Sequence, residues 1–494
     1  MNWKKIQNSR IWRSIFRTRL PIKSNLDRSL LIFNSLTLHI HPVKVRERAI
    51  RFSYTFYLGM ITFFLFVILW VTGILLMLYY QPAIPNAYEN MKDIQYVVSS
   101  GLFLRNMHRW AAHLMVITVF LHMLRVFYHG AFKPPREFNW VIGVFLFILT
   151  ILLSYTGYLL PYDQLAYWAV TVGASIIEYV PLFGEKLRFL LLGGNEIGEY
   201  TLVRFYVLHC IILPIIMTLL IGLHFWRIRK DGGLHYQKPK ETEETETGEK
   251  ETGDRSLELS PASDPSSFIV EDSSGPVQVN KRIAVFPRRI PERFKQAQPP
   301  EKLVTTFPHL IIREVICFQL VIIVSALISL FFNAPLEKIA DPVNTPNPTK
   351  APWYFLGIQE LLHNFPPVVA GVIIPMAVIV ALIVIPYVNT NIEQTRLWAK
   401  NHRKTMVILS LVVFLVVGYS TVYHAFSVVI PTLLLYCLTL IPFLFHREKG
   451  WIYWLARRSL SEWVMIWFVI VLAVLTIIGT YFRGPEWRWV WPWE

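Results

Sequence analysis

The chain has 494 residues, of which 54% are hydrophobic and only 16% are charged, and its formal net charge is +15. Several uncharged apolar runs are long enough to cross a bilayer, which indicates a polytopic membrane protein. The basic residues cluster beside these runs, so they indicate membrane orientation and argue against a nucleic-acid partner. The cysteines Cys210, Cys317 and Cys437 stand singly in apolar runs, which argues against a disulfide framework and against CxxCH attachment of haem.

The N-terminal segment MNWKKIQNSRIWRSIFRTRLPIKS is rich in arginine and poor in acidic residues. Such a segment resembles an organellar transit peptide in composition, but it also fits a basic amphipathic helix on a membrane surface. We expect residues 1–50 to form such a cytoplasmic surface segment.

The apolar runs that follow predict an all-α protein with nine membrane helices, or eight if the seventh and eighth form one span. Their expected positions are about 54–80, 107–128, 138–160, 203–228, 308–333, 366–388, 405–424, 427–446 and 464–482. Lysine and arginine concentrate before the first helix and after the second, fourth, sixth and eighth helices. This pattern predicts a cytoplasmic N-terminus and an outside C-terminus.

A polar, repetitive segment separates two groups of helices. Its composition, as in KPKETEETETGEKETGDRS, predicts a disordered cytoplasmic linker over residues 231–300. We therefore expect a four-helix domain over 51–230, a second domain over 301–425, and additional helices with a tail over 426–494.

Two pairs of histidines lie within predicted membrane helices. His108 and His122, in HRWAAHLMVITVFLH, are fourteen residues apart, which is nearly four helical turns and about 21 Å. His209 and His224 are fifteen residues apart, which in a regular α-helix leaves them about 60° out of line. The spacing predicts an outer pair, His108 with His209, and an inner pair, His122 with His224.

A single histidine in a membrane helix is usually a satisfied polar residue or part of a proton path, and we place His113 and His129 in that class. Four histidines at matched depth on two helices favour ligands, because an unpaired imidazole is costly in hydrocarbon. Two-histidine sites without carboxylates or thiolates suit zinc or copper poorly. Haem needs only two axial ligands and an apolar pocket, so it fits these sites.

Glycines and arginines accompany the histidines. Two glycine pairs, which allow close packing of a flat ligand or of another helix, repeat the fourteen-residue interval: Gly59 with Gly73, and Gly143 with Gly157. Four arginines near helix ends are candidates for pairing with haem propionates, or else are interface arginines: Arg105, Arg109, Arg125 and Arg204.

The stretches RNMHRWAAHLMVITVFLHMLRV, TGYLLPYDQLAYWAV and DPVNTPNPTKAPWYF resemble cytochrome b of the quinol–cytochrome c oxidoreductases. The resemblance is greatest to the plastid-type and bacterial branch, in which the fifteen-residue interval is usual, and it covers roughly residues 30–425. The N-terminal haem-binding part and the C-terminal short-subunit part are joined here in one chain.

The resemblance implies two non-covalent b-type haems, a low-potential one at the outer pair and a high-potential one at the inner pair. It also implies quinol oxidation at an outer site, quinone reduction at an inner site and proton translocation across a bacterial cytoplasmic membrane. The implied partners are a Rieske iron–sulfur protein, a c-type cytochrome subunit and a second copy of the complex.

The sequence departs from the family at two positions. Tyr57 stands where plastid-type proteins carry the cysteine that anchors an extra haem, so a thioether bond is impossible there. The quinol-oxidation motif Pro-Glu-Trp-Tyr reads Ala351-Pro352-Trp353-Tyr354, so its proton-accepting glutamate is absent.

A candidate carboxylate to replace this glutamate lies seven residues beyond Trp353, at Glu360 in GIQELLHNF. In a helix it would project from about the same side as Trp353. We expect Glu360 to accept the proton, with Trp353, Tyr354 and Tyr158 forming the quinol pocket and His363 passing the proton outward. The alternative is an ordinary interfacial glutamate.

Two other classes of protein share some of these features. A di-haem anchor of a dehydrogenase or hydrogenase would use histidine pairs, but it would not need the APWY region. A transporter would suit the helix count, but charges at the midplane are few and no inverted repeat is evident.

Overall fold

The computed structural model describes residues 24–34, 41, 43–134, 136–230, 267–272, 275–280, 302–388, 396–399, 401–445 and 449–491. The chain forms two compact units, one of Met1–Tyr236 with Leu303–Glu494 and one of Gln237–Lys302. In the expected N-terminal surface segment, helix α3 (Asn25–Asn34) is described, whereas residues 1–23 lie outside the described residues.

The region expected to be a disordered linker contains a hairpin of strands β2 (Ser267–Asp272) and β3 (Gly275–Asn280), paired antiparallel. The short apolar run in SFIVED and the alternating valines in GPVQVN are typical of short strands. Residues 231–266 and 281–301, which make up the rest of the expected linker, lie outside the described residues.

Within the described residues, nine helical segments are long and apolar enough to cross a membrane. Helices form there because every backbone N–H and C=O is satisfied within the segment itself. The first four segments are α5 (Leu58–Met77), α7 (Gly101–Tyr128), α8 (Glu137–Tyr158) and a composite of α11 (Glu199–Val207), η2 (Leu208–Ile212) and α12 (Leu213–Lys230). The other five contain α14 (Ile311–Phe331), α16 (Ile374–Val384), α18 (His402–Val422), α19 (Phe426–Leu444) and α21 (Leu460–Tyr481).

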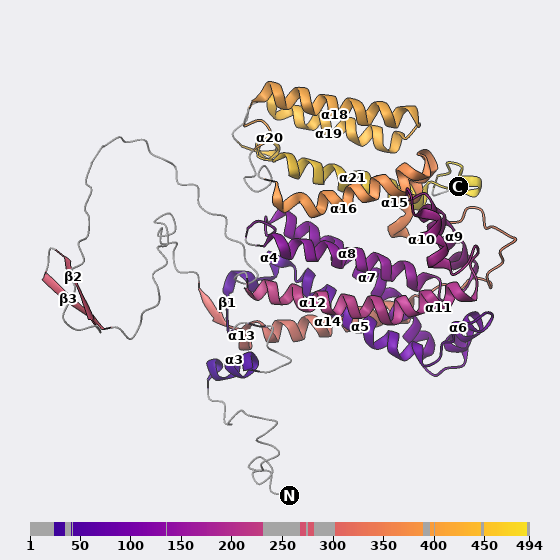
Figure 1. The fold of residues 1–494 in the computed structure, drawn as a ribbon, viewed down its shortest axis with the longest axis horizontal. Helices are drawn as coiled ribbons and strands as arrows, with labels where there is room; N and C mark the ends of the chain where they lie inside the picture. The colour runs from indigo at the N-terminus through magenta and orange to yellow at the C-terminus, as the bar shows by residue number, and fades with distance from the viewer. Residues whose placement is uncertain are drawn as a thin grey trace, which may run out of the picture. The chain divides into compact units, whose positions relative to one another are not determined.

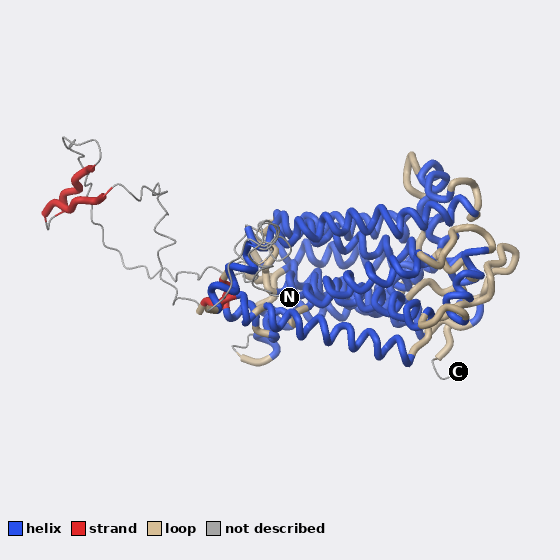
Figure 2. The backbone as a smooth tube through the Cα atoms, turned by 90° about the horizontal axis from the view of Figure 1, so that it is seen from below, coloured by secondary structure: helices blue, strands red, loops and turns tan. Residues whose placement is uncertain are grey.

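Shorter elements cap the two ends of these helices. At one end, strand β1 (Lys44–Arg46) pairs antiparallel with β4 (Leu303–Thr305), beside α4 (Phe52–Thr55) and α13 (Thr306–His309). At the other end, called the outer end below, lie α6 (Asn86–Tyr96), α9 (Gln164–Glu178) and α10 (Gly184–Leu192) (Figure 1). Figure 2 shows the long helices running side by side between these ends.

Helices α5, α7, α8 and α12 pack together around an apolar core, and α14 packs on α5 and α7. Large side chains from all of these helices fill that core, among them Leu65, Met115, Leu146, Met217 and Val321. Because lipid tails are as apolar as leucine, close packing rather than water exclusion holds such helices together.

The chain between α14 and α15 (Trp353–Asn364) is fixed to the outer end of α7. The Asn106 amide donates to the Ser329 carbonyl and accepts from the backbone N–H of Ala334, and the Trp110 indole donates to the Phe332 carbonyl. These bonds fix the end of α14 and the start of the connection to the outer end of α7, and α15 meets α7 separately, through the bond from Trp353 to His113.

The C-terminal helices form a second packed group beyond α15. Helix α21 packs on α15 and on α19, and α18 packs on α19 (Figure 1). Gly479 on α21 faces the Leu356 side chain, and Gly357 on α15 faces Leu472, so small residues let these two helices approach closely. Two short elements complete the group: α20 (Trp451–Ala456) and the turn η7 (Pro485–Trp487).

Candidate functional site

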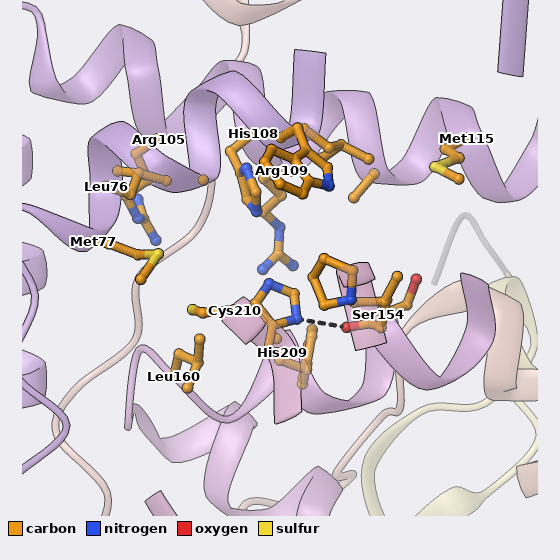
Figure 3. Close-up of a pocket in the computed structure, with 18 of the residues that line it drawn as sticks. Leu76, Met77, Arg105, His108, Arg109, Met115, Ser154, Leu160, His209 and Cys210 are labelled. Atoms are coloured by element: carbon orange, nitrogen blue, oxygen red, sulfur yellow. Dashed lines mark hydrogen bonds between the residues drawn. The ribbon is translucent and has the colours of Figure 1, made fainter. Parts of the chain in front are cut away.

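The outer histidine pair lies across a cavity of about 390 Å³ between α5, α7, α8 and the fourth membrane segment. The ring centres of His108 and His209 are 6.1 Å apart and their planes meet at 76°. Figure 3 shows the two rings on facing walls, with Arg109 reaching in from the His108 side. Two metal–nitrogen bonds of about 2 Å each, set in line between two imidazoles, would separate the rings by about this distance.

Each of the four histidines packs against one of the four glycines. A Cβ on Gly157 would lie 2.5 Å from Cε1 of His209, and one on Gly59 would lie 2.8 Å from Cε1 of His122. At Gly73 and Gly143 the corresponding distances, to Cε1 of His108 and of His224, are 3.2 and 3.8 Å. The glycines therefore make room for the imidazole rings, most strictly at position 157.

Hydrogen bonds set which nitrogen of each outer ring carries the proton. The Thr72 hydroxyl donates to the Ile68 carbonyl at 2.7 Å, so its oxygen accepts from Nδ1 of His108 at 2.9 Å. Nδ1 of His209 donates to the Leu153 carbonyl at 3.0 Å, the bond drawn dashed in Figure 3. Both rings thus keep an unprotonated Nε2, the form that a metal ligand requires.

The inner pair is built from the same helices at their other ends. His122 lies on α7 and His224 on α12, and the two side chains are close enough to interact electrostatically. Nδ1 of His224 is buried and makes no hydrogen bond of ordinary geometry within the described residues, although the Asn139 backbone is its polar neighbour.

A π-helical turn, η2, carries His209 and changes the expected geometry of the fourth segment. A π-turn accommodates about one more residue than an α-helical turn. The fifteen residues from His209 to His224 therefore rotate about as far as the fourteen from His108 to His122, and the expected misalignment of about 60° in a regular α-helix does not arise. The two helices present their histidines in matched register.

The residues present fit haem better than a simple metal ion. Within the described residues, no group of three or more histidine, cysteine or acidic side chains could hold a metal ion. The cavity walls are mainly apolar, with Phe66, Leu69, Met77 and Leu153 among the lining residues. Two facing imidazoles with free Nε2 atoms, flanked by glycine, suit a flat macrocycle that needs only two axial ligands.

The four candidate arginines differ in their partners. Arg105 is buried and donates to the carbonyls of Ala334 and Pro335 at 2.8 and 2.6 Å. Arg125 donates to the carbonyls of Ser53 and Tyr54, and Arg204 to those of Phe189 and Leu190. Arg109 lines the cavity and places its guanidinium 5.3 Å from the ring centre of Tyr158. Three of the four therefore hold backbone carbonyls. Arg105 and Arg109 both line the cavity, and of these two Arg109 is the one whose guanidinium lies against a ring and not against carbonyls.

The APWY motif begins α15 and meets the same cavity. Tyr354 and Tyr158 both line it, together with His113 on α7. The Trp353 indole N–H donates to Nδ1 of His113 at 2.8 Å, and the Tyr354 ring centre is 5.9 Å from that of His113. Three of the four residues expected at the quinol site thus meet around one end of the cavity or beside it.

Glu360, the fourth, lies elsewhere. It is on α15 as expected, but only 1% of its side chain is exposed, and its carboxylate forms an ion pair with Arg483 just after α21. One of the two hydrogen bonds, from Nε of Arg483, measures 3.0 Å. Glu360 is not among the residues that line the cavity. A carboxylate that already accepts two N–H groups from a guanidinium is poorly suited to receive a quinol proton.

Two further residues complete the comparison with the sequence predictions. The Tyr57 hydroxyl donates to the Ile50 carbonyl at 2.8 Å. The His363 ring stacks on Trp487 with ring centres 6.2 Å apart, so it contacts the C-terminal tail.

Sequence reasoning missed Thr72, the π-turn and the contact between His113 and Trp353. Thr72 lies thirty-six residues from His108, and Trp353 lies 240 residues from His113. Of these three features, only Thr72 could have been found from the sequence, because it stands next to Gly73, which was predicted to lie at a haem site.

Comparisons with known proteins agree with this architecture. The family model for "Cytochrome b/b6/petB" matches residues 45–232, and that for "Cytochrome b(C-terminal)/b6/petD" matches residues 339–433. Cytochrome b6 of Heliomicrobium gestii is 45% identical over 192 residues, which cover 39% of this chain and 88% of that protein. The menaquinol:cytochrome c reductase cytochrome b subunit of Geobacillus thermodenitrificans is 43% identical over 195 residues, 39% of this chain and 85% of that protein.

A solved structure described as "Hyperthermophilic respiratory Complex III" shares the fold. Its TM-score is 0.56 at 20% sequence identity, and the alignment covers 96% of this chain and 97% of that one. The two matched family parts account for the histidine-bearing helices and for the APWY helix. The chain therefore belongs to the cytochrome b family, with the b/b6 part and the C-terminal part joined in a single polypeptide.

Proposed function

We propose that this chain is the cytochrome b subunit of a proton-translocating membrane quinol–cytochrome c reductase. The observation that carries the proposal is the set of four partly buried histidines, each facing a glycine, at two depths between the same helices. The relative from Geobacillus thermodenitrificans is named as such a subunit, and the b/b6 family model matches residues 45–232, which include these helices.

In this function the outer pair holds one b-type haem and the inner pair holds the other, both without covalent attachment. Haem bound in this way supplies one-electron transfer between the two faces of the membrane. The protein contributes unprotonated Nε2 atoms, ring orientation and an apolar cavity. Arg109 is placed to meet an acidic group of the outer haem.

Quinol binds at the outer end, between α8 and α15. Tyr158 and Tyr354 form walls of this pocket, and Trp353 supports it from the first turn of α15. Electrons from quinol divide between a Rieske iron–sulfur protein and this chain, which delivers its share to quinone at the inner end. The Rieske protein passes its electron to a c-type cytochrome subunit.

The proposed setting is a bacterial cytoplasmic membrane, with the N-terminus cytoplasmic, the C-terminus outside, and two copies of the complex forming a dimer. Basic residues support this orientation, because they gather at the ends of helices that would face the cytoplasm. The match of residues 339–433 favours a reductase over a dehydrogenase anchor, because an anchor would not need that part.

A reduced-minus-oxidised spectrum of the purified complex tests the proposal. We expect b-type haem absorbance, reduction by added duroquinol, and about two haems for each copy of the chain. Haem staining after denaturing electrophoresis should leave this chain unstained. A complex without b-type absorbance would contradict the proposal and favour a transporter, whereas haem that duroquinol does not reduce would favour an anchor.

A further inference from the structure

The outer cavity lacks the carboxylate that its motif normally supplies. Pro352 stands at that position, as the residue that caps the N-terminus of α15, and a proline side chain neither donates nor accepts a hydrogen bond. Glu360 is engaged with Arg483 and is not among the residues that line the cavity. The polar groups of a quinol that enters from the α15 side must therefore meet other side chains.

Apart from the outer pair, the cavity lining includes one more histidine. His113 sits on α7 five residues beyond His108, and its ring is surrounded by the rings of Trp110, Trp353 and Tyr354, at 5.4, 6.5 and 5.9 Å between ring centres. Unlike the four paired histidines, His113 does not face a glycine within the described residues.

The bond from Trp353 determines what His113 can do. An indole N–H can only donate, so Nδ1 of His113 must be its unprotonated nitrogen, and the neutral ring carries its proton on Nε2. This is the opposite tautomer from that of His108 and His209, whose Nδ1 atoms donate. The neutral His113 ring thus offers an N–H donor and has no free nitrogen lone pair with which to ligate iron.

We propose that His113 is a quinol-binding residue of the outer site, and that its Nε2–H donates a hydrogen bond to a quinol oxygen on the α15 side of the cavity. Trp353 is then a positioning residue that fixes the tautomer. The donated bond holds the substrate in place and orients it in the cavity. This inference rests on the proposed function and extends it by naming the side chain that replaces the motif glutamate as the polar contact.

The test uses the complex in native membranes, with duroquinol as the probe and the reduction of b-type haem as the signal. Replacing His113 with leucine, H113L, removes the donor at similar volume. Loss of one hydrogen bond should raise the half-saturating duroquinol concentration about three- to tenfold with both haems retained. Glutamine at this position, H113Q, restores an N–H donor and should recover most of the affinity. Equilibrium binding of duroquinone should change in the same order.

Trp353→Phe provides a second test that leaves His113 intact. It removes the indole donor, so the proton of His113 is no longer confined to Nε2 and duroquinol binding should weaken. Combining Trp353→Phe with H113L should cause little further loss of affinity. The matched control is Trp110→Phe, which also removes an indole N–H beside His113, but one that bonds the Phe332 carbonyl. This control should leave the half-saturating concentration unchanged.

The outcomes separate this inference from the proposed function. If wild-type haem is not reduced by duroquinol, the proposed function and this inference both fail. If the wild type is reduced and H113L retains its half-saturating concentration, only the role of His113 is refuted. The role is also refuted if H113Q is as weak as H113L, or if Trp110→Phe and Trp353→Phe have equal effects.

Discussion

The outer and inner histidine pairs come from the same two membrane segments, yet they are held differently. The outer rings are fixed by hydrogen bonds to Thr72 and to the Leu153 carbonyl. A Cβ added at Gly73 would lie 3.2 Å from the His108 ring, and one added at Gly157 would lie 2.5 Å from the His209 ring. At the inner pair, Nδ1 of His224 is buried without a hydrogen bond of ordinary geometry within the described residues, and Gly143 leaves space beside it.

This difference shows that equal sequence spacing does not produce equal sites. Hydrogen bonds to the second nitrogen orient a ligating imidazole and keep its other nitrogen available. The outer pair is therefore oriented by the protein alone. The inner pair depends more on packing and on the group that it binds.

The largest expected effect comes from removing one histidine of either pair. His122→Ala should abolish the inner haem and leave most of the outer one, because each site has its own two ligands. The haem content of the purified complex and its low-temperature absorption bands would measure this. His108→Ala is the matched variant and should produce the reverse loss. Equal loss of both haems from a folded protein would show that the two sites are not independent.

The glycine positions offer a graded test of how tightly each ring is packed. Gly157→Ala should greatly reduce outer haem, because its Cβ would lie 2.5 Å from Cε1 of His209 and overpacking of a tight site costs about 1–3 kcal/mol. Gly143→Ala should be tolerated, because 3.8 Å to His224 is an ordinary contact. Pyridine haemochrome assays would compare the two variants. A greater loss of haem in Gly143→Ala than in Gly157→Ala would contradict this order of packing tightness.

Thr72→Val tests whether hydrogen bonding distinguishes the outer pair. The variant keeps the side-chain shape but leaves Nδ1 of His108 without its acceptor, so haem affinity at the outer site should fall about 10–100-fold. Transfer of haem to apomyoglobin would report this as faster loss from the outer site alone. Thr62→Val is the control on α5, because the Thr62 hydroxyl bonds the Leu58 carbonyl and Thr118. Equal haem loss in both variants would deny Thr72 a specific role.

The smallest expected effect concerns Glu360, whose carboxylate was the sequence-based candidate for proton acceptor. Changing Glu360 and Arg483 together to glutamine removes the ion pair without leaving either charge buried alone. Duroquinol oxidation should remain near the wild-type rate, with both haems retained. If Glu360 accepts the proton, turnover should instead fall about 10²–10⁴-fold. Stopped-flow reduction of the b-type haem distinguishes these results.

The membrane helices were predictable because their signal is local. An apolar run must satisfy its own backbone in lipid, and all nine described spans begin and end within a few residues of the predicted positions, for example Glu137–Tyr158 against 138–160. Helices α6, α9 and α10 were not predicted, because these short amphipathic segments at the outer end lack such a run. The β2–β3 hairpin was likewise hidden within a polar, low-complexity region.

The candidate site was predictable only in its repeated elements. The histidines and glycines share an interval that helical geometry converts into facing positions, so their grouping follows from sequence. The partners of single polar residues do not follow in this way. Arg105, a candidate for haem propionates, lines the cavity and also bonds carbonyls 229 and 230 residues away, and Glu360 meets a guanidinium 123 residues away.

The sequence by itself determined that this chain is a multi-span membrane protein with two stacked histidine pairs, because hydropathy and helical periodicity depend on neighbouring residues. The tertiary structure decided which nitrogen of His108, His209 and His113 is free, and which groups bind the arginines and Glu360. These properties depend on the group that each polar atom meets across the fold. Thr72 leaves Nε2 of His108 free for a ligand, whereas Trp353 turns the Nε2 of His113 into a donor, and only long-range packing brings each histidine to its partner.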